Sequence, residues 1–464
     1  MGNGSWWTRS CGGFDVLRQA IPIVISCGSI SLMNFTDRMF LMWYDADAMT
    51  ASMQGMMLFF SAVAIPVGIA AFANTFVAQY NGSGNHSRIG AAVWQGVWFG
   101  FAIVPLLFIC EPLLINLFVL FKHGEQLVAL EKQYFDYMLW GAAATISGES
   151  VAAFFRGRGK MHIEMYNNLF CVALNIFLDY GMIFGNFGFS EMGLAGAAIA
   201  TMISQWVRLI IYVFLMFLTD FREKRYNVVG GMCLDFRLLG RLLYFGMPSS
   251  SYTFIDTVTF TLFIMIIGGL GEQARNATTI AFTMNSLTFI PLVGIGIVVT
   301  SMVGNQLGNN RPDLARRATN TAFVIGCVYT GFFAVLFLLV PEFLLSAFSI
   351  FSDADEFFEV RDLSIILLRF IALYIFFDSC AYIAGSTLRG AGDTVFVMKV
   401  VFICSPLLPV LCFVGIKCFG LGLIWCWIVL TVNVFVYFAF FVQRFCGKKW
   451  ESIRVIEKEL QKIQ

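Results

Sequence analysis

Long apolar segments separated by short polar ones run through almost the whole chain of 464 residues. Each is about 20–28 residues long, and about 20 apolar residues let an α-helix cross a bilayer. Transmembrane β-strands instead alternate weakly over about ten positions. The pattern therefore predicts an all-α membrane protein with twelve transmembrane helices. We expect them at residues 16–43, 52–76, 91–119, 134–155, 164–184, 193–217, 243–268, 277–303, 319–343, 363–386, 394–414 and 419–445.

The composition excludes the soluble classes of protein. Hydrophobic residues make up 59% of the chain and charged residues only 13%, whereas a soluble domain has about 25% charged residues. Disorder is excluded too, because disordered chains have low hydrophobicity. The net charge of +1 gives no reason to expect nucleic acid as a partner. The twelve cysteines are scattered without a Cys/His cluster, so neither a metal cluster nor a disulfide framework is predicted.

Basic residues gather at the N-terminus, after the even-numbered helices and in the C-terminal tail. The segment after the fourth predicted helix, for example, carries Arg156, Arg158 and Lys160. Because loops rich in Lys and Arg stay in the cytoplasm, we expect a multi-pass protein of the plasma (inner) membrane with both termini cytoplasmic. The polar segment 219–242 indicates a cytoplasmic linker between an N-terminal lobe, 1–218, and a C-terminal lobe, 243–446, followed by a cytoplasmic tail, 447–464.

The two halves share a repeated motif. FRGRGKMHIEM begins at Phe155, after the fourth predicted helix, and LRGAGDTVFVM begins at Leu388, after the tenth. Pro22 in the first helix has a counterpart in Pro248 of the seventh. Six-helix halves keep one orientation, and such parallel repeats are typical of transporters with a central cavity. The residues that match at constant offset are Arg156 and Arg389, Gly157 and Gly390, Gly159 and Gly392, and Met165 and Met398.

Four polar residues of the N-terminal half are predicted to lie in one layer of the membrane. An Asp at the bilayer centre costs about 2.5–3.5 kcal/mol and therefore usually has a function. With a rise of about 1.5 Å per residue, Asp37 lies about 10 Å and Asp179 about 8 Å below the outer edge. Asn175 and Thr201 lie about 14 and 12 Å deep, and Asn175 shares a helix face with Asp179. We call these four residues the N-lobe quartet.

The oxygens of the N-lobe quartet suit either Na⁺ or a shared proton. Hard cations choose carboxylate, amide and hydroxyl oxygens, and two close carboxylates can also hold one proton. A proton needs no neutral ligands, so the presence of Asn175 and Thr201 favours Na⁺ at this site. The structural alternative is an interhelical hydrogen bond or an ion pair, which the adjacent Arg38 could form with Asp37.

A second acidic set is predicted in the C-terminal half. Asp378 lies about 22 Å below the outer edge of its helix, and Asp256 also falls near mid-membrane. Tyr374 stands four residues before Asp378 and shares its helix face. We call Asp256, Tyr374 and Asp378 the C-lobe trio.

Several segments, taken in their order and spacing, resemble the multidrug and toxic compound extrusion (MATE) family of cation-coupled exporters. The similarity covers essentially the whole twelve-helix region. It implies two pseudo-symmetric six-helix lobes around a V-shaped cavity that opens alternately to either side. The segments are NFTDRMFL, AQYNGSGN, FRGRGK, ALNIFLDYGMIFG, GLAGAAIATMIS, GMPSSSYTFID, FIPLVGIGIVVTSMVGNQLG, YIFFD and GSTLRGAGDT.

The resemblance also implies roles for single residues. The N-lobe quartet matches the family's N-lobe cation or proton site, and Pro22 matches its helix-bending proline. The C-lobe trio is similar to the acidic site of the sodium-coupled bacterial branch. That branch usually has Glu where this chain has Asp256, and the shorter side chain puts the position of that site in doubt.

Taken together, these features predict a secondary active antiporter and not an enzyme. It would export amphipathic or cationic organic compounds, driven by inward flow of Na⁺ or H⁺, with no other cofactor. No Walker pattern is present, so ATP is not expected to drive it. The expected partners are small organic substrates and the lipid bilayer, and the oligomeric state stays open. One alternative is a related flippase for lipid-linked or polysaccharide substrates, which would have a basic cavity; another is a membrane receptor.

Overall fold

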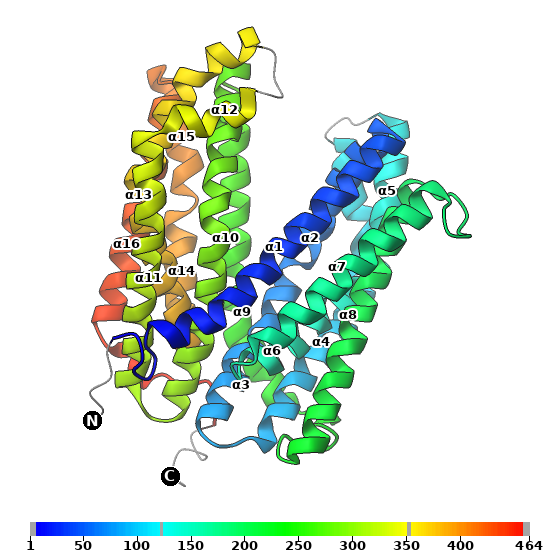
Figure 1. The fold of residues 1–464 in the computed structure, drawn as a ribbon, viewed down its shortest axis with the longest axis vertical. Coiled ribbons are helices and arrows are strands. Elements are labelled where there is room, and N and C mark those ends of the chain that lie inside the picture. The colour runs from blue at the N-terminus through cyan, green and yellow to red at the C-terminus, as the bar shows by residue number, and fades with distance from the viewer. Residues whose placement is uncertain (1–5, 121–123, 350–353, 458–464) are drawn as a thin grey trace. The chain divides into compact units, whose positions relative to one another are not determined.

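The computed structural model describes residues 6–120, 124–349 and 354–457, and every regular element in these ranges is a helix. This confirms the all-α prediction. Figure 1 follows the chain from α1 to α16. The first half contains α1 (Gly13–Tyr44), α2 (Ala46–Ala71), α3 (Ala73–Gly82), α4 (Ser87–Leu120), α5 (Glu125–Trp140), α6 (Ala142–Arg156), α7 (Met161–Phe184), α8 (Leu194–Glu223) and the 3₁₀ helix η1 (Gly230–Met232). The second half contains α9 (Phe236–Gly268), α10 (Glu272–Gly308), α11 (Pro312–Leu339), α12 (Pro341–Ser349), α13 (Ala354–Ala391), α14 (Thr394–Cys404), α15 (Leu407–Phe419), α16 (Leu423–Cys446) and η2 (Lys449–Ser452).

Eleven helical stretches of the described chain are long and apolar enough to cross a membrane, and they stand at eleven of the twelve predicted positions. The exception is the predicted helix 134–155. It is divided at Gly141 into α5 and α6, which have 16 and 15 residues. Gly favours such breaks because it lacks a side chain and destabilises a helix interior. Each piece alone is shorter than the ~20 residues of a bilayer crossing.

The chain forms two compact units. The C-terminal unit contains the residues up to Ala20, Ser251–Leu307 and Arg311–Arg454. The N-terminal unit contains Ile21–Ser250, Gly308–Asn310 and the residues from Val455 onward. The start of the chain thus groups with the C-terminal unit, and part of the tail groups with the N-terminal unit.

Two of the passages between units lie next to a proline inside a helix. Helix α1 passes from one unit to the other just before Pro22, and α9 does so two residues after Pro248. Proline removes one backbone hydrogen bond and clashes with the preceding turn, so a helix bends there most easily. The paired prolines therefore stand where each helix changes its packing partners.

Each unit packs around its own apolar core. In the N-terminal unit α4 packs on α6, and α7 lies beside α8 (Figure 1), around a core that includes Phe76 and Phe155. In the C-terminal unit α13 packs between α11 and α16, around a core that includes Trp427. Many large apolar side chains on the outside of these helices are exposed, as expected for surfaces that face lipid and not water.

The repeated glycines have the same structural role in both units. A β-carbon on Gly157 would lie 2.8 Å from the backbone nitrogen of Ala78, and one on Gly390 would lie 2.6 Å from the carbonyl oxygen of Thr300. Both are impossible contacts, so only glycine allows the helices to approach. Gly159 has φ +73° and Gly392 has φ +97°, in the region that favours glycine. The motif repeats because the same close packing and turn recur.

Candidate functional site

The N-lobe quartet is gathered from three helices of the N-terminal unit. Asp37 lies on α1, Asn175 and Asp179 lie one turn apart on α7, and Thr201 lies on α8. All four side chains are buried: Asp37 is 6% exposed and Asp179 is fully covered. Burying two carboxylates is unfavourable unless hydrogen bonds or positive charge compensate them.

The Asn175 amide lies between the two acids. In the orientation that satisfies its hydrogen bonds, its nitrogen donates to Asp37 Oδ1 at 3.0 Å and to Asp179 Oδ2 at 3.2 Å. The other end of the amide then accepts from Thr201 Oγ1 at 3.4 Å. One amide therefore links all four residues.

Each carboxylate keeps one oxygen without a hydrogen-bond partner among the described residues. These atoms are Asp37 Oδ2 and Asp179 Oδ1, and both are buried. The Asn175 amide, which donates to both, keeps the two carboxyl groups near each other. A proton or a cation bound between them would compensate the repulsion of two close carboxylates.

Two neighbours of the quartet bear on its function. Arg38 is exposed, and within the described ranges it forms no ion pair with Asp37. Of the two structural alternatives, the ion pair is therefore not formed, whereas an interhelical hydrogen bond, from Asn175 to Asp37, is. Tyr134 of α5 is buried, and the charges of Asp37 and Asp179 reach its hydroxyl. The sequence gives no signal for Tyr134, because only the packing of α5 against α2 and α8 brings it there.

The C-lobe trio is less tightly assembled. Tyr374 and Asp378 lie one turn apart on α13, Tyr374 buried and Asp378 half-buried, whereas Asp256 on α9 is exposed. The charge of Asp256 acts on Asp378, and that of Asp378 acts on Tyr374. No hydrogen bond joins the three side chains in the part of the chain that the structure describes. The charges of the trio are thus coupled without a hydrogen bond among the described side chains.

Arg389 is a partner of Asp256 that the sequence analysis did not assign to the site. Its guanidinium lies 4.8 Å from the ring centre of Tyr252, one turn before Asp256, and 5.7 Å from that of Tyr382. It also donates to Ser386 Oγ at 3.0 Å, and its positive charge acts on Asp256. The repeated motif could have indicated Arg389, because it is the Arg of the second copy and matches Arg156 of the first.

A group of four largely covered charged residues lies in the N-terminal unit, with side chains 5–18% exposed. Arg156 at the end of α6 pairs with Glu149 at 2.8 Å and with Glu164 of α7. Glu149 also pairs with Arg208 of α8 at 3.5 Å. Two positive and two negative charges balance, so this group, which we call the charge quartet, has no need of a bound ion.

The family model described as MatE matches residues 22–181 and 248–414, well over half of the chain. Both matched ranges begin at a proline, Pro22 and Pro248. The same model thus describes each half, as the internal repeat predicts.

Curated relatives match over nearly their whole length. The probable multidrug resistance protein NorM of Thermotoga maritima is 26% identical over 448 residues, which cover 96% of this chain and 94% of the relative. The protein of the same description in Bradyrhizobium diazoefficiens is 26% identical over 441 residues, which cover 93% and 92%.

Solved structures share the fold. An outward-facing multidrug resistance MATE family transporter of the MOP superfamily matches with a TM-score of 0.83 at 17% identity, covering 97% of this chain and 100% of that chain. A MOP superfamily transporter from Pyrococcus furiosus matches with a TM-score of 0.82 at 18% identity, covering 95% and 97%.

Proposed function

The chain belongs to the MatE family of multidrug transporters, and from this premise we propose that it is a secondary active antiporter that exports amphipathic or cationic organic compounds. It is a multi-pass membrane transporter and not an enzyme. Inward flow of Na⁺ or H⁺ drives export by alternating access. We place it in the plasma membrane with both termini in the cytoplasm, because the basic residues gather on that side.

The observation that carries the coupling proposal is the buried pair Asp37 and Asp179. Each has an oxygen without a hydrogen-bond partner among the described residues, and one amide bridges the pair. The Asn175 amide donates to both carboxylates, and a cation or proton between them relieves the repulsion that remains. Binding and release of that ion therefore changes the energy of this unit substantially.

The quartet fits both candidate ions, in different ways. For H⁺, the two carboxyl groups hold the proton between them while Asn175 donates to both. For Na⁺, the unpaired oxygens of Asp37 and Asp179 supply two ligands, and Asn175 turns its amide so that the oxygen becomes a third. Thr201 Oγ1 then supplies a fourth oxygen. Bound Na⁺ compensates the two negative charges without any proton transfer.

Ion binding drives export only if it favours one state. A ligand shifts an equilibrium between two conformations only by its differential affinity for them. The quartet is built from α1, α7 and α8, and α1 contains Pro22 at the passage between the units. We infer that a bound ion changes the helix packing around Asp37 and that α1 bends at Pro22 in response.

The C-lobe trio forms a second site for coupling ion or cationic substrate. Asp256 is exposed although it lies within a membrane-spanning helix, so a ligand can reach it without unpacking the unit. Arg389 offsets part of its negative charge. This site therefore attracts a cation less strongly than two unscreened carboxylates would.

The proposal is tested with inside-out membrane vesicles and a fluorescent cationic dye. Outwardly directed Na⁺ and H⁺ gradients are imposed separately, and dye uptake is followed. We expect uptake under one gradient and none in vesicles that carry Asp37→Asn. Equal uptake with and without a gradient, or equal uptake by the variant, would show that the chain is not a coupled antiporter with its ion at Asp37.

A further inference from the structure

The segment after α16 is anchored first to the C-terminal unit. Trp450 is fully buried, stacks on Phe445 with ring centres 5.5 Å apart, and donates from Nε1 to the Phe445 carbonyl at 2.8 Å. Glu451 forms an ion pair with Arg316 of α11 at 2.8 Å. All these residues belong to the same unit.

A few residues later the chain is anchored a second time, in the core of the N-terminal unit. Val455 and Ile456 are both fully covered and belong to the apolar cluster that contains Phe76. The Val455 N–H donates to Gln79 Oε1 at 2.9 Å, and Arg241 donates to the Val455 carbonyl. Hydrophobic burial and hydrogen bonds to the backbone thus attach Val455 and Ile456 to the N-terminal unit.

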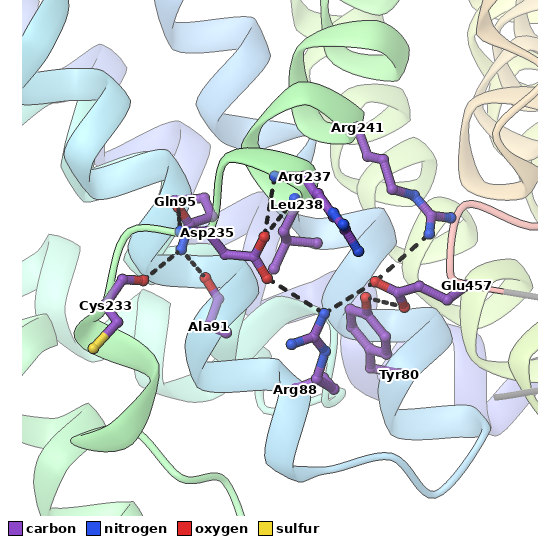
Figure 2. Close-up of polar contacts among 10 residues, drawn as sticks. All are labelled: Tyr80, Arg88, Ala91, Gln95, Cys233, Asp235, Arg237, Leu238, Arg241 and Glu457. Atoms are coloured by element: carbon purple, nitrogen blue, oxygen red, sulfur yellow. Dashed lines mark hydrogen bonds and ion pairs between the residues drawn. The ribbon is translucent and has the colours of Figure 1, made fainter. Parts of the chain in front are cut away.

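Glu457 completes the second anchor with charge. Its carboxylate accepts from the Tyr80 hydroxyl at 2.7 Å and pairs with Arg88 at 3.2 Å and Arg241 at 3.5 Å (Figure 2). Burial by itself raises the pKa of Glu457, but the Tyr80 hydrogen bond and the two guanidinium groups outweigh it and lower the pKa. Arg88 in turn pairs with Asp235 at 3.5 Å. Charged pairs that are partly exposed are the part of the anchor that salt and pH weaken first.

The chain between the two anchors is short. Only Ser452, Ile453 and Arg454 separate Glu451 from Val455, and an extended chain spans at most about 3.6 Å per residue. While both anchors hold, Arg316 and Gln79 cannot move far apart. The first anchor belongs to the C-terminal unit and the second to the N-terminal unit, so the segment is a short covalent link between an attachment point in each unit.

We propose that residues 450–457 form a strap that restrains the transport cycle, and that Glu457 is its release point. This inference rests on the proposed alternating access, since the strap has an effect only if the units move. With Glu457 docked, the covalent link between the two anchors stays at its shortest. When Glu457 detaches, Val455 and Ile456 lose the ion pairs that help to hold them, and the link between the units lengthens.

The first test measures separation directly and needs no transport. Spin labels are attached at Asn320→Cys on α11 and Arg237→Cys on α9, both exposed positions, after the exposed Cys233, Cys418 and Cys446 are replaced by Ser. Double electron–electron resonance then gives the distances. We expect Glu457→Gln, which keeps the side-chain shape, to raise the population of the longer distance at least twofold.

A matched control separates the strap from a general loss of surface charge. Glu223 belongs to the same unit and pairs with Arg158 and Arg225, and among the described residues it forms no hydrogen bond or ion pair with the strap. Glu223→Gln should leave the distance distribution unchanged. Unchanged distances in Glu457→Gln, and also in Tyr80→Phe with Glu457→Gln, would overturn the strap.

The second test locks the strap in place. Gln79→Cys with Val455→Cys, in the same background, is cross-linked with copper phenanthroline in inside-out vesicles. We expect at least tenfold slower dye uptake, restored by dithiothreitol, and full activity of Val455→Cys alone. Uptake at the uncross-linked rate in the locked protein would overturn the inference.

The two proposals fail in different ways. If the antiport proposal is wrong, wild-type vesicles show no gradient-driven uptake, while the distances still respond to Glu457→Gln. If the strap is wrong, wild-type uptake is normal and the distances do not respond.

Discussion

Arg156 donates two parallel hydrogen bonds to Glu164, one from Nε to Oε2 at 2.6 Å and one from Nη2 to Oε1. This fork-to-fork geometry is the strongest form of an ion pair. The third nitrogen, Nη1, reaches Glu149 at 2.8 Å. Both acids and the Arg are largely covered, so Arg156 joins α6 to α7 inside the unit and not in a solvated loop.

Removing one member of this buried group should strongly destabilise the protein. Glu164→Gln leaves Glu149 as the one carboxylate facing both Arg156 and Arg208 in this group, and removing one partner of a buried ion pair costs about 3–5 kcal/mol. Glu223→Gln breaks partly exposed pairs of the same type and should cost only about 0–1 kcal/mol. Unfolding in detergent measures both. Equal small losses would show that water screens Arg156.

Asp37→Asn should abolish gradient-driven export and leave folding intact. The change removes the ion's main ligand but also removes one of two carboxylates that repel each other. Dye uptake measures the first effect and the melting temperature in detergent the second. Arg38→Gln is the control, because Arg38 is exposed and should matter little. A collapse of stability in both variants would instead indicate a structural ion pair between these neighbours.

The coupling ion can be identified by its effect on stability. A ligand that binds only the folded state raises its stability by mass action. If the ion is Na⁺, titrating NaCl against choline chloride at constant ionic strength should raise the melting temperature. Asn175→Leu with Thr201→Val should abolish that rise. If the melting temperature of the wild type does not change with Na⁺ up to molar levels, and a pH gradient alone drives export, then H⁺ is the coupling ion.

The C-lobe trio should behave as one unit in transport. Asp256→Asn and Asp378→Asn should each slow dye uptake, and the double variant should be little slower than either, because residues that share a ligand are non-additive. Tyr374→Phe should have a smaller effect, since it removes one hydroxyl and no charge. Losses that multiply across the two Asp variants would mean that the acids bind separately.

Strap docking should weaken in acid. The pKa of Glu457 is lowered in the folded protein, so its contribution to stability is full above the unfolded pKa of about 4.3 and is lost as pH falls through the folded value. Hydrogen exchange of the Val455 amide, corrected for intrinsic rates, should show more frequent opening near pH 4 than at pH 7.

Glu457→Gln serves as the control for this pH effect. The variant should open as often at pH 7 as the wild type does in acid, with little further change on acidification. A pH dependence that persists in the variant would assign the effect to another group, such as Asp235 beside Arg88.

The apolar runs alone predict the helices, because a bilayer crossing has a fixed length and a continuous run of that length has few other uses. The same holds for the family, which the order of the motifs indicates and the comparisons confirm. Asn175 and Asp179 could be placed on one face from their spacing, since i and i+4 residues meet on any helix. The sequence could not show that the Asn175 amide would lie between two carboxylates, because that depends on how α1 packs against α7.

What the sequence determined by itself is therefore local: helix positions, the repeated motif, the depth of each acid and the family. Tertiary packing decided which residues the charged side chains pair with. The sequence predicts Arg156 to be a cytoplasmic basic residue, yet its side chain is only 11% exposed and pairs with Glu164 of α7. Glu457 belongs to a predicted tail, 447–464, whose residues 458–464 lie outside the described ranges, yet Tyr80 and Arg88 hold it on the N-terminal unit. Contacts between residues hundreds of positions apart follow from the fold and leave no periodic signal in the chain.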